Sequence, residues 1–180
     1  NGNETAFITI DGGTLNMVET GSIEVTFFFD GPATTEIYTQ MGGTHTFHEN
    51  LLIGIENTPD TTPSHVNRII ESLGRDLNVG ITFDIGHSGL IAPAHSSIDP
   101  EEYLRRLTGK IVEVHAHTND AKEDLHLPVT DKGGTIPIKT LLSILLNERN
   151  FHGPIIFEYW RNRMEEDVAF IRNAITGFHP

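Results

Sequence analysis

The sequence predicts an α/β fold with four βα units whose strands form a parallel sheet, preceded by a small antiparallel β segment. From residue 51 onward, short apolar runs alternate with helical patterns. This alternation implies parallel strands joined by right-handed crossovers. Before residue 51, β-prone runs are separated by Asp-Gly and Gly-Gly turns, which are typical of hairpins.

Residues 1–50 form the antiparallel part of this prediction. We interpret them as a β-rich hairpin segment and expect no helix of normal length there. The β-prone runs are residues 6–10, 23–29 and 34–41, and the turn signals are Asp11-Gly12-Gly13, Asp30-Gly31-Pro32 and Gly42-Gly43.

The βα units follow in residues 51–180. Thr62 is a predicted N-cap with Pro63 in the first turn, and Gly74 is the predicted stop of this helix. The next helix is expected to start at Asp99 with an acidic first turn and to end at Gly109. The predicted strands are residues 51–56, 79–84, 111–117 and 154–159.

The last two helices are predicted from apolar residues at helical spacing. One runs from about Pro137 to Asn147. The other is expected to place one apolar face against the core. The residues of that face are Met164, Val168, Ile171 and Ile175.

Four βα units are half of an eight-unit barrel, and a full barrel typically needs about 250 residues. We therefore interpret residues 51–180 as a partial, TIM-barrel-like domain. Three arrangements remain open: the chain is a fragment, it pairs with another half-barrel, or residues 1–50 cover the open sheet edges. The start at Asn1, without Met, suggests processing or a fragment.

The composition limits the class of protein. With 37% apolar and 21% charged residues, the chain has no apolar run near the roughly 20 residues that span a bilayer. It also lacks a recognisable leader sequence, so we expect a cytoplasmic protein without a membrane partner. The absence of cysteine excludes disulfides and thiolate zinc sites.

The formal net charge of −13 has two interpretations, which are compatible with each other. The acidic residues can simply keep the surface soluble, or some of them can be clustered to bind cations. Long lysine or arginine runs are absent, which makes nucleic acid a less expected partner than a small molecule.

Carboxylates and imidazoles stand where the predicted strands end. The carboxyl ends of parallel strands meet on one face, where active sites are built. This face is therefore expected to collect metal-ligating side chains in a metal-binding domain. The expected residues are Glu56, Asp84, His87, His117 and Glu158.

Two further observations bear on this set. His115 and His117 share strand parity and are expected to point to the same side. A carboxylate such as Glu158 in an apolar run must be paired, metal-bound or at the strand end, because burying it alone is too costly. Asp124 and His126 form a second carboxylate–imidazole pair in what is otherwise a polar loop.

Each of these positions also has a structural interpretation. Glu56 can cap the following helix, and Asp84 and His87 can be ordinary turn and surface residues. The other histidines, at positions 65, 95, 152 and 179, are expected to be surface residues. If the set does bind a cation, carboxylate and imidazole ligands without thiolate suit Zn²⁺, Mn²⁺, Mg²⁺ or Fe²⁺.

Five stretches resemble the C-terminal half of the xylose isomerase-like TIM barrels, the superfamily that contains sugar phosphate isomerases and epimerases and endonuclease IV (AP endonuclease family 2). The resemblance spans residues 51–175. The stretches are Ile55-Glu56-Asn57-Thr58, Asp84-Ile85-Gly86-His87, His117-Thr118-Asn119-Asp120-Ala121-Lys122, Asp124-Leu125-His126 and Phe157-Glu158. Their order and spacing carry the resemblance.

The resemblance implies metal ligands, and their roles differ between two branches of the superfamily. In the isomerase and epimerase branch, His87 would lie beside the substrate. In the endonuclease branch, His87, Asp124 and His126 would join a multi-metal cluster, and histidines from early strands would add to it. This chain has no recognisable early half of the barrel, so His45 or His48 would have to take the place of the early-strand histidines. The ligands implied in both branches are Glu56, Asp84, His117 and Glu158.

The function expected first is a divalent-metal-dependent isomerase or epimerase that acts on a sugar or sugar phosphate through an enediolate. Glu56, Glu158 and His87 would be its catalytic residues. The alternatives are an endonuclease IV-type phosphodiesterase acting on abasic DNA and a non-catalytic half-barrel that binds a sugar or a partner subunit. The expected partners are a small substrate and a second copy or a complementary half-barrel.

Overall fold

We analysed a computed structural model. It describes residues 52–59, 61–73, 78–90, 98–159 and 164–177 with their side chains, and the backbone of residues 7–11, 14–18, 25–28, 36–38 and 43–46. In the described residues no helix is both long enough and apolar enough to cross a membrane.

The described strands form two sheets. Strands β1 (Phe7–Asp11), β2 (Thr14–Val18) and β5 (Gly43–Thr46) make an antiparallel sheet in the order β1-β2-β5. Strands β3 (Val25–Phe28) and β4 (Glu36–Tyr38) belong to the second sheet, where β3 is antiparallel to β4 and to β6. The expected antiparallel pairing of the N-terminal segment is thus present, and β3 lies along one edge of the parallel strands.

The predicted parallel sheet with four βα units is confirmed. Strands β6 (Leu52–Glu56), β7 (Val79–Asp84), β8 (Ile111–Ala116) and β9 (Ile155–Phe157) pair in sequence order, all parallel. The six strands of this sheet run β4-β3-β6-β7-β8-β9 and form an open sheet rather than a closed barrel.

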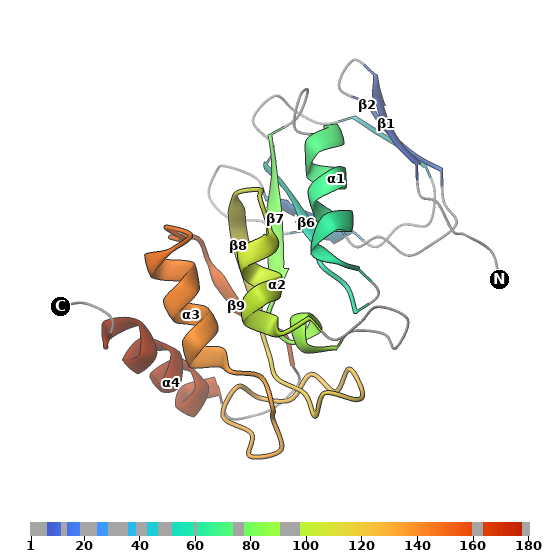
Figure 1. Ribbon diagram of the computed structural model, residues 1–180. Helices are drawn as coiled ribbons and strands as arrows, with labels where there is room; N and C mark the ends of the chain where they lie inside the picture. Colours follow the sequence, from blue (N-terminus) through green and yellow to red (C-terminus); the bar gives the residue numbers. More distant parts are fainter. Residues whose placement is uncertain are drawn as a thin grey trace.

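One helix follows each parallel strand, and the helices lie on one side of the sheet (Figure 1). They are α1 (Pro63–Leu73), α2 (Pro100–Arg106), α3 (Ile138–Asn147) and α4 (Met164–Thr176). A short 3₁₀ turn, η1 (His87–Gly89), follows β7. The sheet's other face is therefore left for the polar residues of the strands.

The predicted helix starts are those the structure shows. Thr62 Oγ1 accepts a hydrogen bond from the His65 amide at 3.3 Å, and α1 begins at Pro63. Asp99 Oδ1 accepts from the Glu101 amide at 2.8 Å, which satisfies one of the free amides of the first turn of α2. Helix α2 ends at Arg106, earlier than the expected stop at Gly109.

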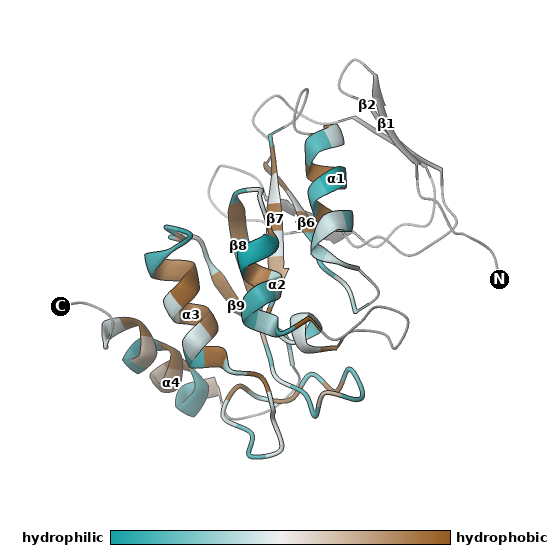
Figure 2. Ribbon diagram, in the orientation of Figure 1, coloured by the Kyte–Doolittle hydropathy of each residue, from teal (hydrophilic) through white to brown (hydrophobic). Residues whose placement is uncertain are grey.

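The core lies between the sheet and the helices. Phe83 of β7 and Val114 of β8 are fully buried there against Leu104 of α2 and Leu141 of α3. Hydrophobic residues, drawn in brown, are prominent along β8 and α3 (Figure 2). Because side chains alternate across a strand, the residues between these core positions lie on the opposite face.

The face of α4 differs from the prediction. Ile171 is buried, but Met164 is 49% exposed. The fully buried residue of the first turn is instead Asp167, whose Oδ1 accepts hydrogen bonds from Thr130 Oγ1 at 2.7 Å and from the Thr130 amide at 3.2 Å. Helix α4 is therefore rotated so that a carboxylate, rather than Met164, contacts the loop between β8 and α3.

Candidate metal centre

Four side chains from the four parallel strands converge where those strands end. Glu56 ends β6, Asp84 ends β7, His115 lies near the end of β8, and Glu158 directly follows β9. Each offers one ligand atom, and these atoms lie within 4.8 Å of one another. We call these four residues the first ligand group.

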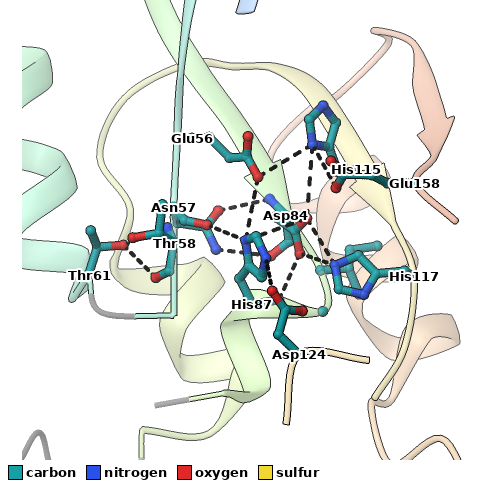
Figure 3. Close-up of polar contacts among 12 residues, drawn as sticks. Glu56, Asn57, Thr58, Thr61, Asp84, His87, His115, His117, Asp124 and Glu158 are labelled. Atoms are coloured by element: carbon teal, nitrogen blue, oxygen red, sulfur yellow. Dashed lines mark hydrogen bonds and ion pairs between the residues drawn. The ribbon is translucent and has the colours of Figure 1, made fainter. Parts of the chain in front are cut away.

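His115 is at the centre of the first ligand group (Figure 3). Its Nδ1 lies 3.4 Å from Glu56 Oε1, 3.3 Å from Glu158 Oε2 and 3.9 Å from Asp84 Oδ2. The register explains this position, because His115 pairs directly with Asp84 across β7 and β8.

A second set of four side chains adjoins the first. We call it the second ligand group, and its ligand atoms also lie within 4.8 Å of one another. His87 Nε2 lies 3.1 Å from Asp124 Oδ2, and His126 Nε2 lies 3.3 Å from Asp124 Oδ1. The rings of His117 and His126 are stacked, with centroids 4.0 Å apart. The members are His87, His117, Asp124 and His126.

Each group contains both buried and partly exposed side chains. Glu56, Asp84 and His117 are buried, at 5%, 0% and 0% exposure. In contrast, the side chains of Glu158, Asp124 and His126 are 34%, 36% and 31% exposed. The centre therefore has a buried floor formed mainly by residues at the strand ends and one side where its ligand side chains are partly exposed.

Two asparagines hold the strand ends and loops in place. The side chain of Asn57 donates to the Asp84 carbonyl at 3.0 Å and accepts from the Asp84 amide at 2.8 Å, which ties the end of β6 to the end of β7. Asn119 donates to the Gly86 carbonyl at 2.8 Å and accepts from the Ala121 amide at 3.0 Å. These bonds join the loops that follow β7 and β8.

The loop after β8 returns to the site through a pair of backbone bonds. Thr118 and Leu127 donate to each other's carbonyls at 2.8 Å each. His126 has φ 44°, a left-handed conformation that is uncommon for residues other than glycine. The turn at His126 carries its ring, and the adjoining Asp124, back over the strand ends.

Three histidines each have one ring nitrogen bonded to a protein oxygen and the other facing a ligand group. Nδ1 of His87 donates to the Asn57 carbonyl at 2.9 Å, and Nδ1 of His126 donates to the Glu158 carbonyl at 2.7 Å. In His115 the two nitrogens have exchanged roles: Nε2 lies next to the Glu113 carboxylate, and Nδ1 faces the first ligand group. Such bonds orient imidazole rings for metal binding.

The local charges shift the pKa values strongly. Burial lowers the pKa of His115, but the hydrogen bond to Glu113 and the close carboxylates of Glu158 and Glu56 outweigh it and raise the pKa to about 12. Burial is likewise outweighed at His87, where the close carboxylate of Glu56 and the nearby aspartates raise the pKa to about 10. Burial raises the pKa of Glu158, but His115 lowers it to about 2 overall. In the metal-free protein, the positive charges of the protonated histidines thus offset the negative charges of the carboxylates.

Buried polar atoms that make no hydrogen bond show whether these residues fit a cation. Both carboxylate oxygens of Glu56, Nδ1 of His115 and Oε2 of Glu158 are buried and make no hydrogen bond in the described part of the chain. Leaving such atoms unsatisfied costs free energy. Because they converge within the first ligand group, one divalent cation would satisfy several at once, and the carboxylate and imidazole donors suit Zn²⁺, Mn²⁺, Mg²⁺ or Fe²⁺.

The structure brings together the residues that the sequence predicts as metal ligands, but it divides them differently. His117 lies in the second ligand group, and His115 lies beside Glu56 and Glu158 in the place expected for His117. The sequence signal for His115 was its strand parity with His117. The remaining predicted residues, Asp84, His87, Asp124 and His126, all belong to one group or the other.

The histidines outside the predicted set have other positions. His65 and His152 are exposed, as expected for surface residues. The side chains of His45 and His48, the proposed replacements for early-strand ligands, lie outside the described residues, as do His95 and His179.

Comparison with known proteins identifies the family. Residues 43–174 match the family model described as xylose isomerase-like TIM barrel. The chain therefore belongs to the xylose isomerase-like TIM barrel family, which confirms the resemblance. The uncharacterized protein MJ1311 of Methanocaldococcus jannaschii is 33% identical over 115 residues, a match that covers 59% of this chain and 36% of that relative. The matched region thus spans about a third of the relative's length.

Members of this family include isomerases, epimerases and endonuclease IV, and they commonly bind divalent metals. The two ligand groups described above are where this chain has side chains suited to that role.

Proposed function

We propose that the protein is a divalent-metal-dependent isomerase or epimerase that acts on a sugar or sugar phosphate. The arrangement of the first ligand group is the observation that carries this proposal. Its two glutamates come from the outermost of the four parallel strands, with Asp84 and His115 between them. Two carboxylates on opposite sides of a metal-ligand group suit a reaction that moves a proton on and off carbon.

In this proposal the cation is held by the first ligand group. A bound divalent cation supplies Lewis-acid stabilisation of negative charge on substrate oxygens. Glu56 and Glu158 accept and return the carbon-bound proton whose removal gives an enediolate. The Glu158 side chain is 34% exposed while Glu56 is buried, so the substrate enters from the side of Glu158.

Three features support a small polar substrate. The open side of the centre is bordered by Asp124, His126 and Glu158, which offer hydrogen bonds to hydroxyl groups. His87 lies beside the first ligand group, with Nδ1 3.4 Å from Glu56 Oε1. The formal charge of −13 disfavours a long polyanion as the natural substrate.

The test is solvent exchange at carbon. Protein loaded with Mn²⁺ or Zn²⁺ is incubated in D₂O with a panel of free and phosphorylated ketoses and aldoses. Deuterium is expected on the carbon next to the carbonyl, detected by NMR. Glu158→Gln should abolish this exchange, whereas Glu102→Gln, which changes a surface ion pair with Arg106, should leave it intact. The proposal is wrong if no sugar of the panel exchanges.

A second candidate is an endonuclease IV-type phosphodiesterase acting on abasic DNA. The observation that favours it is the second ligand group directly beside the first, since paired metal sites stabilise both the attacking and leaving oxygens in phosphoryl displacement. A duplex with a single abasic site distinguishes the two candidates. Nicking of that duplex without sugar exchange would establish the second candidate, and activity in neither assay would favour a binding protein.

A further inference from the structure

Glu113 is a buried carboxylate that the proposed reaction does not use. It lies on β8 two residues before His115, so both side chains are on the same face of the sheet. Glu113 is fully buried, with 0% exposure. Its cross-strand neighbour is Thr82, which is also fully buried.

Glu113 contacts His115 on the side away from the first ligand group. Oε1 of Glu113 lies 3.0 Å from Nε2 of His115. A carboxylate only accepts hydrogen bonds, so Nε2 carries the proton and donates. The other ring nitrogen, Nδ1, is then the one left to act as a ligand, and it is the one that faces Glu158 and Glu56 at 3.3 and 3.4 Å.

The contact is poorly explained as a contribution to folding. Oε2 of Glu113 makes no hydrogen bond within the described residues, and neither does Oγ1 of Thr82 beside it. A buried carboxylate with an unsatisfied oxygen costs stability, and a buried carboxylate–imidazole pair can often be replaced as a whole by apolar residues without loss. A role toward His115 accounts for retaining a charge at this depth.

We infer that Glu113 is a positioning residue: through its hydrogen bond to Nε2 it fixes the ring of His115 so that Nδ1 faces the first ligand group. Carboxylates bonded to the distal nitrogen of a ligating histidine orient the ring and increase its basicity as a ligand. The inference rests on the proposed function only in that the first ligand group holds a cation. It makes no claim about the substrate.

The test compares three variants by metal binding rather than by turnover. Glu113→Leu removes the acceptor at similar volume, and Glu113→Gln keeps an oxygen that can accept from Nε2. Thr82→Val is the matched control, because it changes the buried neighbour of Glu113 and removes no hydrogen bond of the described residues. All are made in a His126→Ala background, which disables the second ligand group so that the first is measured alone.

Zn²⁺ affinity is measured by competition with a chromophoric chelator, and the visible spectrum of bound Co²⁺ reports the ligand geometry. We expect Glu113→Leu to weaken affinity by about 10–100-fold and to shift the Co²⁺ bands. Glu113→Gln should fall between Glu113→Leu and the parent, and Thr82→Val should match the parent. Urea unfolding of the metal-free proteins should show a loss of stability for Glu113→Leu, because this change leaves the buried His115 ring without its carboxylate partner.

The outcomes separate the two claims. Equal affinities and spectra in all variants overturn the positioning role alone. A loss of affinity without a shift of the Co²⁺ bands also overturns it, because a residue that only supports folding would lower affinity without changing the ligand geometry. A parent protein that binds neither Zn²⁺ nor Co²⁺ overturns the proposed function together with this inference.

Discussion

Asp84 Oδ1 lies 2.9 Å from His117 Nε2, and this contact joins the two ligand groups. Asp84 is a member of the first group and His117 of the second. Burial raises the pKa of Asp84, and the hydrogen bond with His117 offsets part of that effect. The aspartate is therefore the residue on which both groups depend, and changing it should have a wider effect than changing any ligand at the rim.

Asp84→Asn is expected to reduce Zn²⁺ or Mn²⁺ binding at both groups by more than about tenfold, since even residues behind the ligands have effects of this size. Asp124→Asn should weaken only the second group, because Asp124 contacts His87 and His126 but none of the glutamates of the first group. The measurement is the number of metals bound per chain, by elemental analysis after dialysis at a fixed free metal concentration. Equal losses in the two variants would contradict the shared role of Asp84.

Replacing His115 of β8 and His117, which directly follows β8, by alanine tests which ligand group each histidine belongs to. His115→Ala is expected to weaken the first ligand group and leave the second, whereas His117→Ala should do the opposite. The measurement is a Zn²⁺ titration by calorimetry, fitted with two sites. His152→Ala is the control, because His152 is exposed and contacts Asn150 rather than the centre. If His117→Ala removed the site that contains Glu56 and Glu158, the structural assignment would be wrong.

The pKa shifts predict how the stability of the metal-free protein depends on pH. The raised pKa values of His115, about 12, and His87, about 10, against an ordinary 6.5 give stability that is complete below pH 6.5 and is lost as pH rises toward those values. The lowered pKa of Glu158, about 2 against 4.5, gives stability that is present above pH 4.5 and is lost in more acidic solution. The free energy of unfolding in chelator should therefore be highest near pH 5 to 6.

Metal affinity should have the opposite dependence above neutral pH. A cation must displace the protons of His115 and His87, so Zn²⁺ binding should strengthen from about pH 6 to about pH 9 and release protons. Urea unfolding in chelator and chelator competition across this range measure the two trends. A metal-free protein that became more stable between these pH values would contradict the charge arrangement.

Gly86 is expected to tolerate no side chain. A Cβ at this position would lie 2.0 Å from Cε1 of His117. The backbone itself is ordinary, with φ −66° and ψ −44°, so only the steric contact would matter. Gly86→Ala should lower the free energy of unfolding by about 1–3 kcal/mol and weaken the second ligand group.

The matched control for this change is Gly133→Ala. A Cβ there would meet only Oδ1 of Asp131, at 3.3 Å, which the end of a side chain can yield. Urea denaturation should show little change for this control. A Gly86→Ala protein as stable as the Gly133→Ala protein would contradict the close packing of Gly86 against the His117 ring.

Much of the fold could be predicted from the sequence, because its signals are local. Apolar runs define the parallel strands, and Thr62-Pro63 and Asp99-Pro100 mark helix starts that the structure confirms. Met164 was predicted on the apolar face of α4, but it is exposed. The contact that decides this is between Asp167 and Thr130, which are 37 residues apart and share no sequence pattern.

The site was predictable as a collection of residues but not in its internal arrangement. His115 and His117 have the same parity, so the sequence cannot distinguish which of them is level with Asp84. The register decides it, and the register shifts at an irregularity between Ile81 and Thr82 of β7. A break of this kind depends on how two strands pair and has no signature in either one.

Strand β8 has a consequence for how this centre can change. Glu113, His115 and His117 follow one another at every second residue, so consecutive α-carbons of the series are about 6.6 Å apart through the covalent repeat of an extended chain. The deletion of one residue of β8 before Glu113 would turn all three side chains toward the helices. The distance between the two ligand groups is thus set by backbone stereochemistry, and variation in the centre is confined to the loop that carries Asp124 and His126.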